Sequence, residues 1–183
     1  EIASLLEAIG AKLVVADGTI VEGKLQEILS HCRTAPRCMS LAQLHAGEAA
    51  APSGNPRDRS SEIVAIFHTG GTTGLPKLVP LSGLNIAAMA LASAFAYGYL
   101  PQDRVFAAMP MFHVGGLLAS TLYPLVCGAR VVMAGEYGYR GKGTVAATWA
   151  LAEREEASVL IGPPTVMGQL AQAIPPREKL PRL

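Results

Sequence analysis

The chain has 183 residues, 50% of them apolar and 16% charged, with a formal net charge of +1. This composition predicts a globular chain that can bury a core, and it excludes an intrinsically disordered one. The small net charge, without a basic stripe or a zinc-finger spacing, argues against a nucleic-acid partner. Three cysteines and the lack of a signal peptide predict a reducing, cytoplasmic location.

The chain begins with short elements, followed by a polar stretch. Apolar residues at helical spacing predict a helix over residues 2–9, which Gly10 ends as a left-handed cap. A strand is expected over residues 12–16 and a short helix around residues 25–29. Residues 46–61 combine Ala, Gly, Pro, Ser and Arg, a composition typical of an exposed linker.

A zinc site is an alternative reading of the cysteines in this region. Cys32 and Cys38 lie close in sequence to His31 and His45. Their spacing matches no standard pattern of paired zinc ligands, so we expect free thiols and no metal site.

The most informative segment follows the next predicted strand, residues 63–67. The run 68–77 packs three glycines, three threonines and a lysine into ten residues. Glycines let a backbone approach a ligand, successive N–H groups converge on an anion, and Lys77 adds a positive charge. The loop, residues 68–78, therefore predicts binding of a nucleotide triphosphate. The residues expected to hold its phosphates are Thr69, Gly70, Gly71, Thr72, Thr73, Gly74 and Lys77.

Two common phosphate loops do not fit this run. A Walker loop ends in Gly-Lys-Ser/Thr, whereas Lys77 lies between Pro76 and Leu78. A dinucleotide-binding loop needs Gly-x-Gly-x-x-Gly at the start of a helix, whereas Gly70 and Gly71 are adjacent. An ordinary turn needs far fewer glycines and threonines.

The rest of the chain alternates helices with strands. Helices are expected over residues 84–97, 115–126, 144–156 (with Thr144 as its N-cap) and 164–173, and strands over residues 104–108, 129–133 and 158–161. This alternation predicts an α/β fold with helices flanking a layered, largely parallel sheet. Residues 78–102 and 105–129 carry no charge, but Pro and Gly interrupt both stretches, so we expect no transmembrane span.

The run 68–77 resembles the phosphate-binding signature of the adenylate-forming superfamily, Tyr-Thr-Ser-Gly-Thr-Thr-Gly-x-Pro-Lys-Gly. This superfamily comprises acyl-CoA synthetases, aryl-CoA ligases, luciferases and the adenylation domains of peptide synthetases. Gly70 replaces the usual Ser, Leu78 replaces the usual Gly, and residues 82–85 lack the His of a Thr-His-x-Asn segment. Seven positions match in register: Thr69, Gly71, Thr72, Thr73, Gly74, Pro76 and Lys77.

Two weaker resemblances lie downstream. Residues 109–116 resemble the family's Pro-x-Phe/Tyr-His-x-x-Gly segment, which implies that His113, Gly115 and Gly116 bind substrate beside the acyl pocket. By themselves these residues also fit a His at a strand end and glycines that allow close helix packing. Residues 159–167 resemble the family's strand and Pro-Thr helix start, although Pro is common at the start of any helix.

The resemblance implies that residues 1–183 are part of the N-terminal domain of an acyl-CoA synthetase, without its C-terminal half and small C-terminal domain. The full protein would be an AMP-forming acid–thiol ligase of fatty acid metabolism that uses a carboxylic acid, ATP, Mg²⁺ and coenzyme A. Lys77 and Thr69 would be catalytic residues of this part, and the main Mg²⁺ ligand would lie in the missing part. We expect the isolated chain to be inactive and its apolar surfaces to favour a homodimer.

Three other functions fit parts of the sequence. A peptide-synthetase adenylation domain would usually carry aromatic-Asp-x-Ser at residues 112–115, so His113 favours a CoA ligase. A non-catalytic nucleotide- or anion-binding module would explain the departures at Gly70 and Leu78. A structural or membrane-associated interaction domain would explain only the apolar composition.

Overall fold

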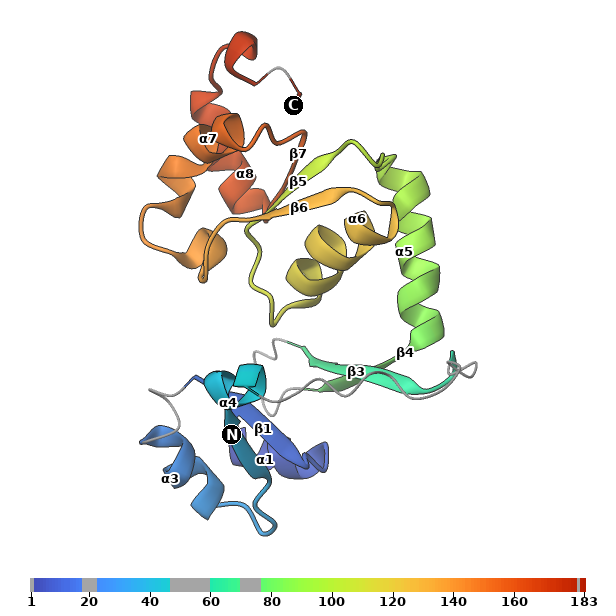
Figure 1. Cartoon of the computed structure of the whole chain (residues 1–183), viewed down its shortest axis with the longest axis vertical. Helices are drawn as coiled ribbons and strands as arrows, with labels where there is room; N and C mark the ends of the chain where they lie inside the picture. The colour runs from blue at the N-terminus through green and yellow to red at the C-terminus, as the bar shows by residue number, and fades with distance from the viewer. Residues whose placement is uncertain (1, 18–22, 47–59, 70–76, 181) are drawn as a thin grey trace. The chain divides into compact units, whose positions relative to one another are not determined.

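The computed structural model describes residues 2–17, 23–46, 60–69, 77–180 and 182–183 (Figure 1). Most of the predicted linker, residues 47–59, lies outside the described residues. The chain forms two compact units, residues 1–58 with 70–77 and residues 59–69 with 78–183. Every helix in the described ranges is too short or too polar to span a lipid bilayer.

The first unit is built on two parallel strands, β1 (Leu13–Ala16) and β2 (Arg37–Ser40). Parallel neighbours need a crossover, and this one contains the helix α3 (Lys24–Ser30). The helices α1 (Ile2–Ala8) and α4 (Leu41–Ala46) come before β1 and after β2. The sequence predicts α1, β1 and α3 but neither β2 nor α4, because β2 is short and polar and shows no alternation of apolar side chains.

Gly10 ends α1 as predicted. Its φ of +61° is left-handed, a conformation that glycine adopts without steric cost. The N–H of Gly10 donates to the carbonyl of Glu7, and the N–H of Ala11 donates to the carbonyl of Leu6. Together these bonds form the glycine cap that commonly closes a helix.

The cysteines Cys32, Cys38 and Cys127 are free thiols. His31, beside Cys32, contacts the carbonyl oxygen of Glu27 through Nδ1 at 2.7 Å. Within the part of the chain that the structure describes, no three His, Cys, Asp or Glu side chains come together in a way that could hold a metal ion.

The second unit contains a three-stranded parallel sheet in the order β6, β5, β7 (Figure 1). The strand β5 (Arg104–Ala107) lies between β6 (Arg130–Met133) and β7 (Val159–Ile161) and is parallel to both. All three strands are predicted from the sequence. Their parallel pairing confirms the α/β fold with a largely parallel sheet and flanking helices.

The two faces of β5 pack into different parts of the core. Phe106 belongs to a cluster that includes Ala152 of the helix α7 (Thr144–Arg154). Val105, the next residue along the strand, belongs to a second cluster that includes Tyr99. Because neighbouring side chains point to opposite faces, β5 is covered on both sides, as the central strand of a parallel sheet must be.

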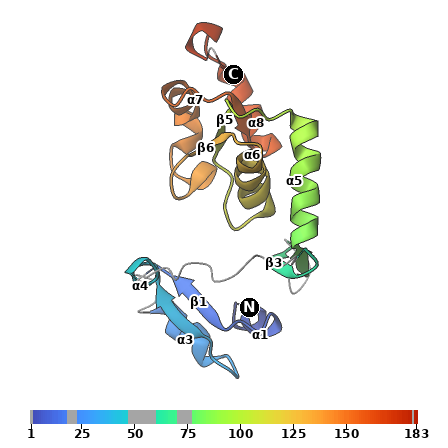
Figure 2. The ribbon, with the colours of Figure 1, turned by 45° about the vertical axis from the view of Figure 1, so that its right-hand side comes forward.

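The helices α7 and α8 (Pro164–Leu170) lie beside each other in both Figure 1 and Figure 2. The predicted N-cap of α7 is wrong, because Gly143 is the N-cap and Thr144 is already the first helical residue, with no side-chain cap bond. Gly143 has a φ of +80°, a conformation that threonine rarely adopts. The helix α8 begins at Pro164 as predicted and continues into a 3₁₀ turn, Ala171–Ala173.

The strand predicted at residues 63–67 pairs with a strand that the sequence does not predict. The strands β3 (Ile63–His68) and β4 (Leu78–Ser82) are antiparallel, so residues 69–77 connect the two strands of a hairpin. Pro80 argues against a strand at β4 in the sequence, because proline lacks the N–H that a strand in the interior of a sheet donates. The described sheet has only these two strands, where proline is tolerated.

The helix α5 (Gly83–Tyr97) follows β4 directly and begins within one residue of the predicted start. Ser82 is its N-cap: Ser82 Oγ accepts the N–H of Asn85 at 3.1 Å, and Asn85 Oδ1 accepts the N–H of Ser82 at 3.0 Å. This reciprocal pair satisfies two N–H groups at the helix start. The Ser and Asn in residues 82–85 therefore have a structural role, although the His of the family segment is missing.

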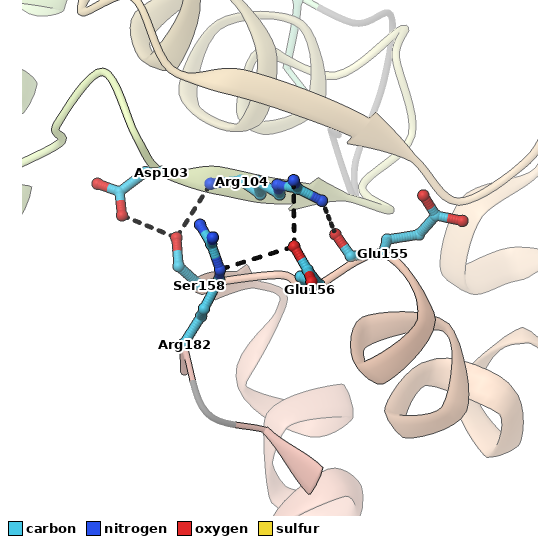
Figure 3. A network of polar contacts seen from close by, with 6 residues as sticks. All are labelled: Asp103, Arg104, Glu155, Glu156, Ser158 and Arg182. Carbon is cyan, nitrogen blue, oxygen red and sulfur yellow. Dashed lines mark hydrogen bonds and ion pairs between the residues drawn. The ribbon is translucent and has the colours of Figure 1, made fainter.

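A polar network joins the start of β5 to the connection between α7 and β7, as Figure 3 shows. Ser158 Oγ donates to Asp103 Oδ1 at 2.7 Å and accepts the backbone N–H of Arg104 at 3.0 Å. The Arg104 guanidinium donates to the Glu155 carbonyl at 3.0 Å and pairs with the Glu156 carboxylate at 3.1 Å. These contacts fix the amino-terminal end of β5.

Glu156, which follows Glu155, the C-cap of α7, has a left-handed backbone with a φ of +50°. Its N–H donates to the Glu153 carbonyl, and the Ala157 N–H donates to the Ala152 carbonyl, a cap in which glycine is favoured. A left-handed residue other than glycine costs about 1–2 kcal/mol. Both Glu156→Gly and Glu156→Ala lose the ion pairs with Arg104 and Arg182, but only glycine relieves this cost. We expect Glu156→Gly to be about 1 kcal/mol more stable than Glu156→Ala in urea unfolding.

Glu155 provides the matched control for this comparison. Its φ of −89° is ordinary, so Glu155→Gly should be less stable than Glu155→Ala by about 0.5–1 kcal/mol. The two ion pairs themselves contribute little, because the Glu156 side chain is 51% exposed. If the Gly variant were less stable than the Ala variant at position 156 as well as at position 155, the backbone strain inferred at Glu156 would be contradicted.

Candidate active site

The predicted phosphate loop connects β3 to β4. Its central residues, Gly70, Gly71, Thr72, Thr73 and Gly74, lie outside the described residues. The described ends are Thr69 and Lys77, which directly follow His68 and precede Leu78, and these two strand residues are paired. Thr69 and Lys77 are both exposed. The hairpin therefore fixes where the loop leaves and rejoins the fold, and the phosphate-binding roles of its residues stay predictions.

His113 follows β5 and stands at the start of a helix. Its backbone N–H donates to the Pro110 carbonyl at 3.0 Å, and its Nδ1 accepts the N–H of Gly115 at 2.9 Å. A neutral imidazole has one donor and one acceptor nitrogen, so this bond assigns the ring proton to Nε2. His113 is exposed. It can therefore present Nε2–H as a donor to an oxygen of a substrate.

Gly115 and Gly116 pack against the segment that leaves β5. A Cβ at Gly116 would lie 2.0 Å from the Pro110 carbonyl oxygen, and a Cβ at Gly115 would lie 2.7 Å from Met109 Cε. Gly116 is also buried. Close packing of the helix thus explains these glycines, and their contact with a substrate stays a prediction.

The segments that leave β5, β6 and β7 meet at the carboxyl edge of the sheet, where open α/β sheets bind ligands. Tyr139, in the 3₁₀ turn Gly138–Arg140 after β6, donates its N–H to the Ala108 carbonyl at 2.7 Å. Its ring lies against Gly162 after β7, where a Cβ would be 3.0 Å from Tyr139 Cε2. Tyr139 therefore ties the three strand ends together.

Arg140 in the same turn reaches the segment that carries His113. Its guanidinium carbon lies 5.6 Å from the centroid of the Phe112 ring, a distance at which a cation is attracted to an aromatic face. The sequence interpretation does not identify Tyr139 or Arg140. The available signal was the four glycines within residues 135–143, directly after a predicted strand.

The Tyr139 hydroxyl is buried and has no hydrogen-bond partner among the described residues. Burial raises the pKa of Tyr139 to about 12. Tyr139→Phe removes this unsatisfied group, so the free energy of unfolding in urea at pH 7 should rise by about 1 kcal/mol. The folded protein also keeps a proton that the unfolded chain releases near pH 10, so its stability should fall as the pH rises from about 10 to 12. In the Tyr139→Phe variant, the free energy of unfolding should fall less over this pH range.

Tyr97→Phe is the control, because Tyr97 is 67% exposed and water can satisfy its hydroxyl. This variant should have the stability of the wild type at pH 7. A Tyr139→Phe protein less stable than wild type would show that the hydroxyl has a partner outside the described residues.

The end of β3 shares a core cluster with the helix that follows His113. Phe67, near the end of β3, packs against the cluster that contains Leu118 and Tyr123. Leu118 belongs to the π-helix η1 (Gly115–Leu122), and Tyr123 begins the helix α6 (Tyr123–Val126). The described flank of the phosphate loop and the helix of the predicted acyl pocket are thus parts of one packed region.

A family model described as AMP-binding enzyme matches residues 1–183, the whole chain. The chain belongs to the AMP-binding enzyme family. It is 33% identical over 138 residues to the sulfoacetate–CoA ligase of Cupriavidus necator, across 75% of this chain and 26% of that protein. It is 48% identical over 64 residues to the oxalate–CoA ligase of Saccharomyces cerevisiae, across 35% of this chain and 12% of that protein.

The fold of this AMP-binding family member is similar to the crystal structure of ATP-bound MatB from Rhodopseudomonas palustris. The TM-score is 0.81 over 100% of this chain and 36% of that chain, at 23% sequence identity. An identity this low shows the fold alone, which is that of part of the N-terminal domain of an acyl-CoA synthetase. The chain spans 12–36% of the length of these three proteins.

Proposed function

We propose that the full protein is an AMP-forming ligase that activates a carboxylic acid as an acyl-adenylate and transfers the acyl group to coenzyme A. Membership of the AMP-binding enzyme family and the relatives that are CoA ligases support this proposal. The structural observation that carries it is the cluster shared by Phe67 and Leu118. This cluster joins the flank of a loop suited to phosphates to the helix behind a His suited to a carboxylate.

In the first half-reaction, a carboxylate oxygen of the acid attacks the α-phosphorus of ATP, and the bond to pyrophosphate breaks. The acid is already ionised at neutral pH, so no general base is needed. The loop N–H groups and threonine hydroxyls would hold the β- and γ-phosphates, while Lys77 would neutralise the departing pyrophosphate. The Nε2–H of His113 would donate to the second carboxylate oxygen and orient the first for attack.

In the second half-reaction, the thiol of coenzyme A attacks the acyl carbon, and AMP leaves. Mg²⁺, when bound, would neutralise part of the phosphate charge. The described residues contain no cluster of acidic side chains for this ion. The resemblance to the adenylate-forming superfamily implies that its main ligand comes from the part of the protein outside these 183 residues.

The isolated chain should not complete this reaction, because contacts to adenine, ribose and Mg²⁺ would come from the rest of the protein. Apolar side chains of α5 support the expectation of a homodimer of the isolated chain: Phe95 is 89% exposed and Tyr97 is 67% exposed.

The test is carboxylate-dependent ATP–pyrophosphate exchange by the full-length protein. The acids to screen are acetate, medium- and long-chain fatty acids, benzoates, malonate, oxalate and sulfoacetate. We expect exchange with one class of acid and none without acid or with the isolated chain. A folded full-length protein that binds ATP but exchanges with no acid would instead support a non-catalytic nucleotide-binding module.

A further inference from the structure

The helix that follows His113 is wound more widely than an α-helix over its first eight residues, the π-helix η1 (Gly115–Leu122). Its turn at the C-terminal end closes with a hydrogen bond from the Tyr123 N–H to the Leu118 carbonyl, five residues earlier. Such turns are rare in proteins, and those that occur are frequently found at functional sites.

Two hydroxyl groups support the wide turns from inside the helix. Ser120 Oγ shares its one hydrogen between the carbonyl oxygens of Gly115 at 3.1 Å and Gly116 at 3.0 Å, and Thr121 Oγ1 donates to the Gly116 carbonyl at 2.8 Å. The bonds from Ser120 to Gly115 and from Thr121 to Gly116 span five residues, as the main-chain bonds of a π-helix do. Ser120 is 0% exposed, so water cannot replace its hydroxyl.

The helix is fixed near both ends. Gly116 lies against the main chain of Pro110, and Tyr123 and Pro124 are buried at the other end. A wide turn therefore accommodates one more residue between two fixed points than an α-helix would. If the wide turn relaxed to an α-helix, the helix would shift by one residue relative to its fixed end. Such a shift would rotate the end that carries His113 by about 100°.

Gly115 and Gly116, whose carbonyls accept the Ser120 hydroxyl, also form hydrogen bonds with His113. The Gly115 N–H donates to His113 Nδ1, and the Gly116 N–H donates to the His113 carbonyl, both at 2.9 Å. The carbonyl groups of these glycines bind Ser120, so Ser120 and His113 are connected through two peptide units. A change in the turn would reorient the imidazole.

We propose that Ser120 is a positioning residue for acid activation, which holds the wide turn so that His113 Nε2–H meets the carboxylate of the acid. This proposal rests on the proposed function. It predicts that removal of the Ser120 hydroxyl impairs use of the acid more than use of ATP.

The test compares Ser120→Ala with Thr148→Val in the full-length enzyme. Thr148 is also 0% exposed and donates to a carbonyl within its helix, that of Thr144 at 2.9 Å, but it lies in α7. Both variants lose a buried hydroxyl and should lose similar stability. Ser120→Ala should reduce kcat/KM for the acid by about 10- to 100-fold, with KM for ATP unchanged, because small displacements at a reacting centre have effects of this size. Thr148→Val should retain the wild-type kcat/KM.

Hydrogen exchange gives a second readout that does not depend on turnover. The amides of Gly115 and Gly116 should exchange faster in Ser120→Ala than in wild type or Thr148→Val, and Thr121→Ser, which keeps its hydroxyl, should behave as wild type. If Ser120→Ala does not fold, Thr121→Val, which removes one of the three bonds, takes its place with a smaller expected effect.

Equal losses of kcat/KM in Ser120→Ala and Thr148→Val would overturn the proposal, and so would unchanged exchange at Gly115. If none of the acids tested supports pyrophosphate exchange by the wild-type enzyme, the proposed function is wrong. The role of Ser120 toward the acid is then wrong as well. The hydrogen-exchange comparison then decides separately whether Ser120 holds the segment of His113.

Discussion

Replacement of Lys77 by alanine in the full-length enzyme should slow acyl-adenylate formation by about 10²–10³-fold, the size of effect seen when one preorganised donor is removed from a developing charge. Lys77 directly precedes Leu78, whose pairing with His68 anchors the end of the phosphate loop. Pyrophosphate gains negative charge as its bond to the α-phosphorus breaks. The ammonium group is therefore worth more in the transition state than in the complex with ATP, and kcat should fall more than KM for ATP rises.

The two half-reactions must be measured separately. ATP–pyrophosphate exchange reports adenylation, and the reaction of a supplied acyl-adenylate with coenzyme A reports thiol transfer. Pyrophosphate has already left before the second step, so Lys77→Ala should change thiol transfer little. Lys24→Ala, which removes an exposed lysine at the start of α3, is the control and should behave as wild type. Equal losses in both half-reactions would refute the role proposed for Lys77.

The fold was predictable wherever the hydrophobic pattern was strong. The strands β5, β6 and β7 are apolar runs bounded by turns, and all three lie in the parallel sheet. The strands β2 and β4 lack such a pattern. Their positions depend on pairing with β1 and β3, and a pairing between distant residues leaves little trace in the local composition. The predicted N-cap at Thr144 is wrong for a local reason: the N-cap has a φ of +80°, which glycine adopts more easily than threonine.

The candidate site was predictable where a residue type is unusual for its place. The resemblance of residues 109–116 to a family segment predicted a substrate-binding role for His113. The structure puts this segment at the carboxyl edge of the sheet, and the role itself stays a prediction. Tyr139 and Ser120 could not be identified in this way, since tyrosine and serine are common residues. Their roles depend on burial and on partners that only the folded chain supplies, such as the carbonyls of Gly115 and Gly116.

Gly116→Ala should destabilise the protein by about 3 kcal/mol or more, at or above the upper end of the usual cost of overpacking. The new methyl group would lie 2.0 Å from the Pro110 carbonyl oxygen and 2.6 Å from its carbonyl carbon. Both are main-chain atoms, so no side-chain rotation can relieve the contact. The helix must move away from the segment that leaves β5, and His113 moves with it, because its carbonyl accepts the Gly116 N–H.

Gly168→Ala is the matched control for the same added methyl group. Gly168 lies inside α8, and a Cβ there would meet no other atom within 4 Å. Alanine is the better helix former, so this variant should be more stable than wild type by about 0.5–1 kcal/mol. Urea unfolding of both variants, with pyrophosphate exchange at a temperature where both are folded, separates stability from activity. Gly116→Ala should then still lose about 100-fold in acid activation, as expected for a displaced orienting group. Full exchange activity in folded Gly116→Ala would show that the position of His113 does not matter for the reaction.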